Sequence, residues 1–272
     1  MSESKRYLGL DLAGARNQKT VLAILEYYPK EQKTFLLDTY EHIGESDTKT
    51  GDEVLLSIIF ELKSEAAKMA VNVPLDLPPC ITCRLGSCPL PSKCRVSEVK
   101  WMQSLIHKLH LKQATPYTQR PVELWIKNKV LPKLPKNHKL EIDEALGGNK
   151  APLSARMHFL RKHLEHIDVI EAWPKLSTSI LALDLGLSGK IISSYRHLES
   201  GAHSREVILE TLVDKHGIFI YERDIRKLAY GLASFDAFIC AYTALLTDQG
   251  KCPGPPRGFP VSAGWVHYPN IP

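Results

Sequence analysis

The sequence lacks any hydrophobic run long enough to cross a membrane as a helix. Its longest apolar stretch, AFICAYTALL at residues 237–246, is about half of the roughly 20 residues that a bilayer span requires. The chain opens with MSESKRY, which is polar and leads directly into an expected strand, so no signal peptide is predicted. We therefore expect a soluble, cytoplasmic protein with no membrane partner.

The sequence also lacks internal repeats, low-complexity tracts and a large excess of one charge. Its 272 residues are 44% hydrophobic and 24% charged, which is the balance of an ordinary globular protein with a full core. A net charge of +5 permits a polyanionic partner but does not require one. Nothing in the sequence specifies an oligomeric state.

The hydrophobic periodicity predicts an α/β fold built on a mixed sheet with helices on both faces. Three consecutive strands with short turns suggest a meander at residues 6–13, 19–28 and 33–43. Later strands at 69–75 and 167–173 alternate with helices and are expected to pair in parallel. Helices are expected at 51–68, 98–111, 152–166, 203–217 and 232–248, with a final hairpin within 251–269.

We expect one domain over residues 1–272 that carries two insertions. Residues 78–95 are rich in proline and cysteine and leave little room for regular structure. Residues 113–151 contain several prolines and the pair Gly147–Gly148, so loops are expected there, with a short helix near 121–130. Residues 175–200 form a mixed segment to which no element is assigned.

Three acidic residues stand inside otherwise apolar segments. Asp11 lies in the strand YLGLDLAG (7–14), Glu171 near the end of IDVIEAW (167–173), and Asp236 in the apolar helix between Phe235 and Phe238. A buried charge costs several kcal/mol unless it is compensated. The alternatives to a shared site are an edge-strand Asp11, a solvent-facing Glu171 and a core ion pair for Asp236.

These acids would repel one another if they converged at one end of the sheet, unless a cation bound between them. Oxygen ligands suit Mg²⁺ or Mn²⁺, and such ions activate water and stabilise a leaving phosphate oxygen. The pattern therefore indicates a metal site for phosphate chemistry.

The order of these segments resembles the DUF429 family of predicted nucleases within the ribonuclease H-like superfamily. The resemblance implies a ribonuclease H-like sheet, a metal-dependent nuclease activity, a nucleic-acid partner, and Asp11, Glu171 and Asp236 as the catalytic, metal-binding acids. The matching pieces span nearly the whole chain: GLDLAG (9–14), VNVPLDLP (71–78), YTQRPVE (117–123), LGGNKAPLSAR (146–156), VIEAWP (169–174), SREVILETL (204–212) and FDAFICAYTA (235–244).

Asn72 departs from the family pattern, which commonly has an acid at this position. Its amide offers a neutral carbonyl oxygen, so one charge is missing from the expected site. Asp76 could replace it only if the chain beyond Pro74 folds back. This leaves open a catalytically inactive protein that binds nucleic acid or protein. An actin-like ATPase ranks last, because no second phosphate loop or adenosine motif is visible.

Several polar side chains are expected to face the acids and contact the substrate. Glycines at 147 and 148 would let the backbone approach a ligand closely, although an ordinary turn and solvated surface arginines are the alternative interpretation. The expected substrate-binding residues are Asn72, Arg120, Lys150, Arg156 and Arg205.

The cysteines of the first insertion are spaced as Cys80-x2-Cys83-x4-Cys88-x5-Cys94. In a reducing compartment such a cluster favours metal binding over disulfides. A closed tetrahedral zinc site is the first expectation, a [4Fe–4S] cluster the second, and free thiols or disulfides the third. A metal would supply folding energy to this proline-rich loop. Basic residues on the loop and at 127–139 could contact nucleic-acid backbone, with solvated loops as the alternative.

Overall fold

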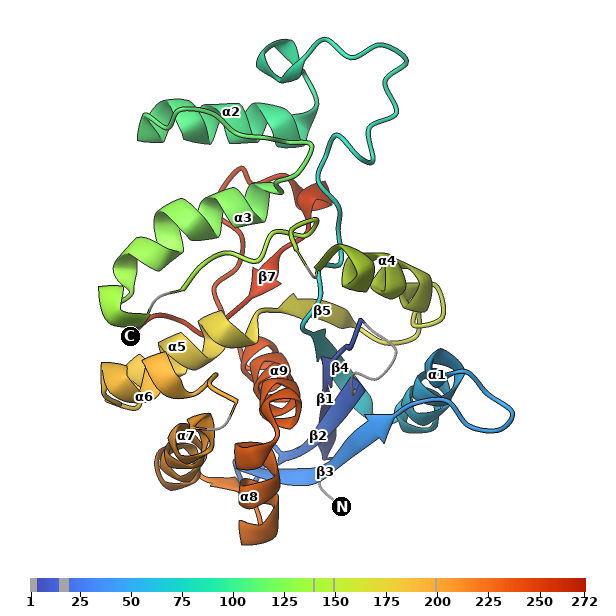
Figure 1. Cartoon of the computed structure of the whole chain (residues 1–272), viewed down its shortest axis with the longest axis vertical. Coiled ribbons are helices and arrows are strands. Elements are labelled where there is room, and N and C mark those ends of the chain that lie inside the picture. Colours follow the sequence, from blue (N-terminus) through green and yellow to red (C-terminus); the bar gives the residue numbers. More distant parts are fainter. Residues whose placement is uncertain (1–3, 15–19, 139, 149, 199) are drawn as a thin grey trace.

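The computed structural model describes residues 4–14, 20–138, 140–148, 150–198 and 200–272 (Figure 1). Seven strands of these residues form one sheet in the order β6-β3-β2-β1-β4-β5-β7. Their bounds are β1 (Lys5–Asp11), β2 (Thr20–Tyr28), β3 (Lys33–Ile43), β4 (Ala66–Val71), β5 (Val169–Ala172), β6 (Ile218–Phe219) and β7 (Val266–His267).

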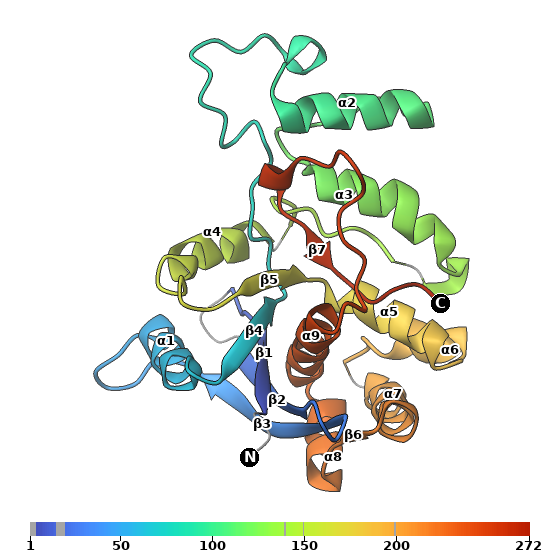
Figure 2. The same cartoon turned by 180° about the vertical axis from the view of Figure 1, so that it is seen from behind.

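The predicted combination of a meander and parallel strands is confirmed. Strands β1, β2 and β3 pair antiparallel in sequence order, whereas β4 pairs parallel to β1 and β5 pairs parallel to β4. The expected C-terminal hairpin is wrong, because β7 pairs parallel to the outer edge of β5 (Figure 2). There the backbone of Val266 and His267 pairs with an edge of β5 that would otherwise stay unpaired.

The predicted helices are present with shifted ends, and two more occupy the segment left without an assigned element. The helix expected at 51–68 ends at Leu62, because residues from Ala66 onward join the sheet as β4. The helices are α1 (Gly51–Leu62), α2 (Ser97–Leu109), α3 (Pro121–Trp125), α4 (Lys150–Arg161), α5 (Pro174–Asp184), α6 (Gly189–Ser194), α7 (Gly201–His216), α8 (Glu222–Tyr230) and α9 (Leu232–Asp248). Shorter turns are η1 (Pro91–Lys93), the π-helical η2 (Ile126–Val130), η3 (Leu131–Lys133), η4 (Lys136–His138) and η5 (Val261–Ala263).

Alternating residues of the central strands build a core on each face of the sheet. Leu8 and Leu10 pack with Leu55 of α1 and Met157 of α4. Tyr7, on the opposite face, belongs to the core that contains α9. Helices therefore cover both faces, as the sequence predicted (Figure 1).

Gly9 allows α9 to lie directly on β1. A Cβ at this position would stand 2.0 Å from the carbonyl oxygen of Ala237 and 2.2 Å from the backbone nitrogen of Ala241. Asp11 is two residues beyond Gly9 and shares its face, because side chains alternate along a strand. The close approach therefore brings the second turn of α9, which contains Asp236, toward the end of β1.

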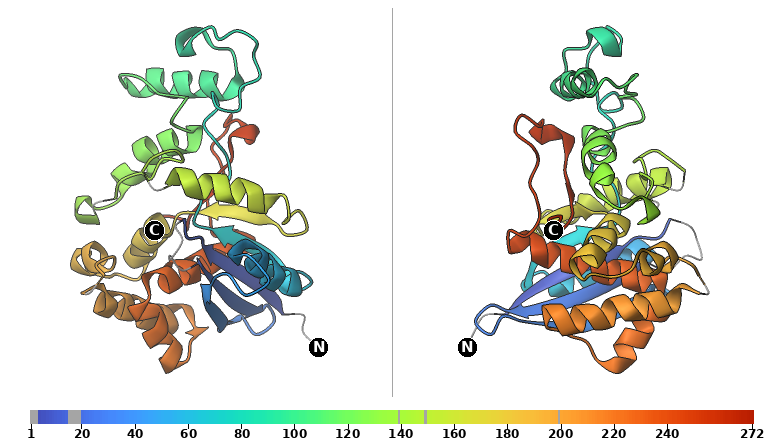
Figure 3. Two further views of the ribbon diagram at one scale, coloured as in Figure 1. Left: turned by 45° about the vertical axis from the view of Figure 1, so that its right-hand side comes forward. Right: turned by 90° about the vertical axis from the view of Figure 1, so that its left-hand side faces the viewer.

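The cysteine-rich loop and α2 project from one end of the molecule, away from the sheet (Figures 1 and 3). Within residues 78–95 the only helical turn is η1. In the described part of the chain, no single helix has the length and apolar composition to cross a membrane; α8 and α9 meet that test only as a pair bent by 113°.

Candidate functional site

Asp11 ends β1 and is held by the side chain of Asn72, the first residue after β4. The Asn72 amide nitrogen Nδ2 donates a hydrogen bond of 2.7 Å to Asp11 Oδ1. Lys150, at the start of α4, donates from Nζ to the Asn72 backbone oxygen at 3.2 Å and to Asn72 Oδ1 at 3.3 Å. An acid, an amide and an ammonium group therefore form a chain across the ends of three elements.

Asp236 approaches Asp11 from the second turn of α9. It is buried, and Arg196 Nη1 bonds to both of its oxygens, at 3.1 Å to Oδ1 and 2.8 Å to Oδ2. The ion pair considered for Asp236 from the sequence is thus present. Its partner lies just after α6, in a segment to which no element was assigned from the sequence.

Ionisation of Asp11 and Asp236 is unfavourable in these surroundings. Burial raises the pKa of Asp11 to about 7, and the charge of Asp236 adds to this shift, while the Asn72 hydrogen bond and the charges of Lys150 and Arg196 oppose it. Burial also raises the pKa of Asp236, despite the guanidinium of Arg196. The existing cations therefore offset the buried negative charge only in part.

A cleft of about 530 Å³ opens over Asp236 and Asn72. Basic side chains of Lys150, Lys175 and Arg196 line it. Lys175 also pairs with Asp143 across 3.0 Å. The predicted turn at Gly147 and Gly148 forms part of the wall. The acids Asp143 and Glu144 line it as well, so the cleft sets Asp236 among side chains of both charges. Carboxylates and cations in one cleft suit a phosphate group bound beside a metal ion.

Glu171 is held differently, although it also ends a parallel strand. Arg120 donates to both of its oxygens, from Nη1 to Oε2 at 2.7 Å and from Nη2 to Oε1 at 2.8 Å. The backbone nitrogen of Leu75 adds a bond of 2.9 Å to Oε2. Glu171 is 5% exposed and Arg120 is 2% exposed. Both oxygens of this acid are therefore already engaged by protein donors.

Arg120 has a structural role in place of the expected contact with substrate. Its Nε bonds to Glu123 Oε1 at 2.7 Å, and Glu123 Oε2 accepts from the Arg120 backbone nitrogen at 2.8 Å. The two adjacent carboxylates raise the pKa of Arg120 above its ordinary value. The guanidinium thus connects the start of α3 to the end of β5 through buried ion pairs.

Arg156 and Arg205 also bond to the protein itself. Arg156 pairs with Asp52 at 2.6 Å and donates to the backbone oxygen of Ala13, so it fixes the chain just after Asp11. Arg205 is fully buried and donates to the backbone oxygens of Tyr195 and Ala229. The alternative of a solvated surface arginine is wrong for Arg205, whose bond to Tyr195 supports the backbone next to Arg196.

The structure brings Asp11, Asp236, Asn72 and Lys150 together and leaves Glu171 with Arg120. Across the described ranges, no group of three or more Asp, Glu, His or Cys side chains is arranged to hold a metal ion. Asp76 forms an ion pair with Arg161 at 3.7 Å. Sequence reasoning missed Arg196 and Lys175, because only the tertiary fold carries them to the cleft.

The four cysteines of the projecting loop form no disulfide with another described residue. Burial raises the pKa of Cys80, and the charges of Cys94, Cys83 and Cys88 raise it further. Electrostatic coupling of this kind requires the groups to be near one another. The loop thus gathers its cysteines in one region.

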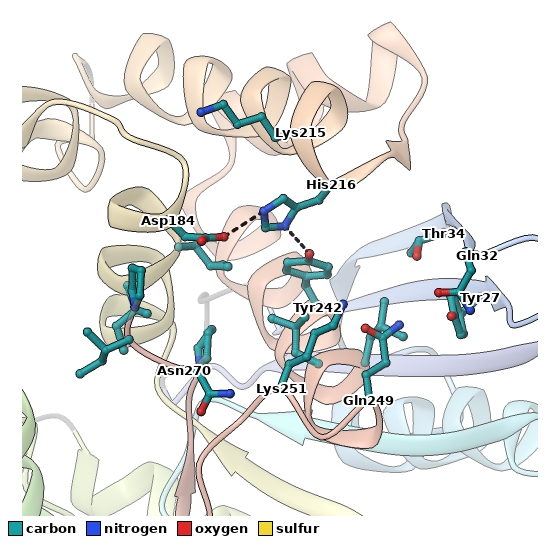
Figure 4. A pocket seen from close by; sticks show the side chains of 17 residues that line it. Tyr27, Gln32, Thr34, Asp184, Lys215, His216, Tyr242, Gln249, Lys251 and Asn270 are labelled. Atoms are coloured by element: carbon teal, nitrogen blue, oxygen red, sulfur yellow. Dashed lines mark hydrogen bonds and ion pairs between the residues drawn. The ribbon is translucent and has the colours of Figure 1, made fainter.

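A second cavity of about 560 Å³ lies at the opposite end of the sheet, beside the turn between β2 and β3 (Figure 4). Here His216 Nδ1 lies 2.6 Å from the Tyr242 hydroxyl, and His216 Nε2 lies 3.1 Å from Asp184 Oδ2. A neutral imidazole has one N–H, so Asp184 favours the proton on Nε2 and Nδ1 accepts from Tyr242. Asp184, His216 and Tyr242 each have a hydrogen-bonding partner of complementary chemistry, in contrast to the two acids Asp11 and Asp236.

No protein-family model, curated protein or solved structure matches this chain. The fold and the geometry of its clefts are therefore the basis for assigning a function.

Proposed function

We propose that this protein is a metal-dependent nuclease with a ribonuclease H-like fold, related to the DUF429 family, which hydrolyses phosphodiester bonds in the cleft at Asp11 and Asp236. The observation that carries the proposal is the pair of opposed, buried acids. Burial, together with the charge of Asp236, raises the pKa of Asp11 to about 7, and a divalent cation would stabilise the ionised form of both acids. A protein with such a site would work in the cytoplasm, where Mg²⁺ is plentiful.

The donor groups fit one hard cation better than two. Asp11 and Asp236 supply carboxylate oxygens, the ligand type preferred by Mg²⁺ and Mn²⁺. Glu171 is committed to Arg120, and Asn72 contributes no charge. When bound, the cation would lower the pKa of a water molecule and offset the charge that develops on the phosphate.

The side chains around the acids have separate tasks in this proposal. Asn72 orients Asp11 through its amide, and Lys150 fixes the amide in turn. Arg196 holds Asp236 and lines the cleft together with Lys175. Cations at these positions would bind the non-bridging oxygens of a phosphodiester and place the phosphorus over the acids.

The substitution Asp11→Asn tests the proposal. We expect cleavage of labelled single- and double-stranded DNA and RNA with Mn²⁺ or Mg²⁺ to fall by about a thousandfold, which corresponds to roughly 4 kcal/mol of transition-state stabilisation. Asp184→Asn is the matched control, since it removes a carboxylate from the opposite cavity and should leave cleavage unchanged. Equal activity of the wild type and Asp11→Asn would refute the assignment.

A non-catalytic binding protein is the second candidate. Two observations favour it: Asn72 stands where the family pattern has an acid, and Glu171 is engaged by Arg120. Titration calorimetry with Mn²⁺ separates the candidates. A metal-binding nuclease should bind at least one ion and lose that binding in Asp236→Asn, whereas absence of binding at millimolar Mn²⁺ supports the non-catalytic protein.

We further propose that Cys80, Cys83, Cys88 and Cys94 bind a structural zinc ion. The loop has little apolar packing, because Ile81 and Leu85 are each 52% exposed and Leu90 is 66% exposed. Leu90 also adopts φ of 67° and ψ of 154°, a conformation costing about 1–3 kcal/mol that persists only where the surroundings enforce it. Ligation by the cysteines on either side of Leu90 would provide that constraint.

Elemental analysis of the purified protein tests the zinc site. We expect one zinc per chain, lost in Cys83→Ser and Cys88→Ser but retained in Cys252→Ser, which alters a cysteine outside the loop. If the protein instead contains iron and absorbs at roughly 400 nm, the loop binds an iron–sulfur cluster and not zinc. Absence of both metals after anaerobic purification would contradict a metal site.

A further inference from the structure

A groove on the outer side of α3 has a chemistry distinct from that of the acidic cleft. It is a hollow of about 390 Å³ formed by α2, the end of α3 with η2, and the loop at Pro256–Gly258. Two tryptophans and three basic residues characterise it, and we call it the tryptophan groove: Trp101, Lys108, Trp125, Lys129 and Arg257.

The tryptophan rings are fixed in place by other aromatic residues. The ring centroids of Trp101 and Trp125 are 6.2 Å apart at an interplanar angle of 50°. Phe259 contacts Trp101 edge-on at 4.9 Å and Trp265 at 5.1 Å. Both groove tryptophans remain partly exposed. Rings held in this way form a platform on which a planar group can stack with little loss of conformational entropy.

The charges of the groove are of one sign. Among its described lining residues the charged side chains are Lys108, Lys129 and Arg257, and none of them forms an ion pair with another described residue. A purely structural aromatic cluster needs no such cations. Three uncompensated cations beside partly exposed aromatic rings complement a ligand with repeated negative charges and flat faces.

The position of the tryptophan groove connects it with the acidic cleft. Helix α3 begins next to Arg120, which holds Glu171, and ends at Trp125. At a rise of 1.5 Å per residue, Arg120 and Trp125 lie about 8 Å apart along the helix axis. Ile126, the next residue, lines a small cavity together with Asn72 and Lys150. One short helical segment thus lies between the tryptophan groove and a small cavity that shares Asn72 and Lys150 with the acidic cleft.

We propose that the tryptophan groove binds single-stranded nucleic acid. Bases stack on Trp101 and Trp125, and Lys108, Lys129 and Arg257 pair with the phosphates. Stacked bases must be unpaired, so the groove selects single strands over duplexes. The inference rests on the proposed nuclease function, since it supplies the surface that holds the substrate beside the acidic cleft.

Binding of fluorescein-labelled oligothymidylate of about 15 nucleotides, followed by fluorescence anisotropy with the 272-residue Asp11→Asn protein, tests the groove without cleavage. Trp101→Ala should weaken binding about tenfold or more, because stacking contributes roughly 1–3 kcal/mol per base, and Trp101→Phe should retain most of the affinity. Tyr230→Ala is the aromatic control, since Tyr230 is 78% exposed on α8.

The exposed Arg257 provides a variant that leaves the aromatic packing intact. Arg257→Gln should reduce the slope of log K against log salt concentration by about 0.7, the value for one phosphate contact on a single strand. Lys30→Gln, on the turn between β2 and β3, should leave the slope unchanged. Circular dichroism of each variant establishes that the fold is retained.

The outcomes separate the groove from the nuclease. Unchanged binding in Trp101→Ala and Arg257→Gln, or tighter binding of a duplex of the same length, refutes the groove as a single-strand binding site. This holds even if the wild type cleaves DNA. Binding that depends on the groove, with no cleavage by the wild type, supports the groove and refutes catalysis.

Discussion

Asp11 and Glu171 lie at the ends of parallel strands on either side of β4, yet the partners of their carboxylates differ in charge. Glu171 accepts two bonds from Arg120 and one from the backbone of Leu75. Asp11 accepts a bond from a neutral amide and faces a second carboxylate. Glu171 is thus neutralised by the protein itself, while Asp11 retains a charge that a cation from solution could neutralise.

This difference separates a structural buried charge from a functional one. A permanent ion pair lowers the energy of the folded chain relative to either charge alone. An acid pair without sufficient compensation raises it, and such unfavourable groupings are typical of functional sites. The comparison predicts that removal of charge at the two strand ends will affect stability in opposite directions.

The largest effect on stability is expected for Arg120→Met. It leaves the buried Glu171 and Glu123 without their shared partner, and loss of one member of a buried ion pair costs about 3–5 kcal/mol. Urea denaturation should show this decrease in the free energy of unfolding. Asp11→Asn is the comparison, because it removes an unfavourable charge and should leave stability unchanged or higher.

A double variant separates loss of the ion pair from loss of packing. Combining Arg120→Met with Glu171→Gln should recover part of the stability lost in Arg120→Met, because the uncompensated charge at the end of β5 is gone. Equal stability of the single and double variants would show that Arg120 contributes by packing alone.

The pH dependence of unfolding gives the next effect. Burial and Asp236 raise the pKa of Asp11 from 3.8 to about 7 in the folded protein, so the native state holds a proton that the unfolded chain releases. Stability from this group is therefore highest below pH 4 and falls as the pH rises to 7, by roughly 1 kcal/mol per pH unit for one proton.

The comparison between wild type and Asp11→Asn isolates this titration from that of other acids. Unfolding should be measured without added divalent cations between pH 4 and 8. The difference in unfolding free energy between the two proteins should shift in favour of Asp11→Asn as the pH rises. Burial sets the pKa of Asp11 together with Asp236, Asn72, Lys150 and Arg196, and Cys240 also faces Asp11, whose charge raises the pKa of that thiol. A pH-independent difference would contradict the raised pKa.

The sequence predicted the sheet well because its signals are local. Continuous apolar runs predicted the strands of the meander, and the apolar stretch around Asp236 predicted α9, whereas the two-residue strands β6 and β7 were not predicted. The period of residues 175–200 is obscured by serines and threonines, which the fold buries against α9; Ser177 and Thr178 are fully buried. Helix α5 was missed for that reason.

The site was predicted only in part because pairing between distant residues has no local signal. Arg120 and Glu171 were both singled out, but as a substrate contact and a metal ligand, since a separation of 51 residues does not reveal their ion pair. Gly9 could have indicated one feature of the site from the sequence alone. A glycine inside an apolar strand, two residues before Asp11, indicates close approach of another backbone on the face of Asp11.

The smallest effect is expected from restoring an acid at Asn72. Asn72→Asp places a third carboxylate beside Asp11, within reach of Lys150. It should increase the uncompensated negative charge at the end of β1 and so enlarge the contrast with the neutralised end of β5. We expect Mn²⁺ affinity, measured by titration calorimetry, to rise about tenfold, which corresponds to roughly 1.4 kcal/mol. The free energy of unfolding without metal should fall, because the added charge faces Asp11. Asn270→Asp, which is exposed and lies outside the cleft, is the control and should change neither quantity. A decrease in Mn²⁺ affinity would show that the amide of Asn72 supports the metal site by orienting Asp11, and that a third charge is not what the site lacks.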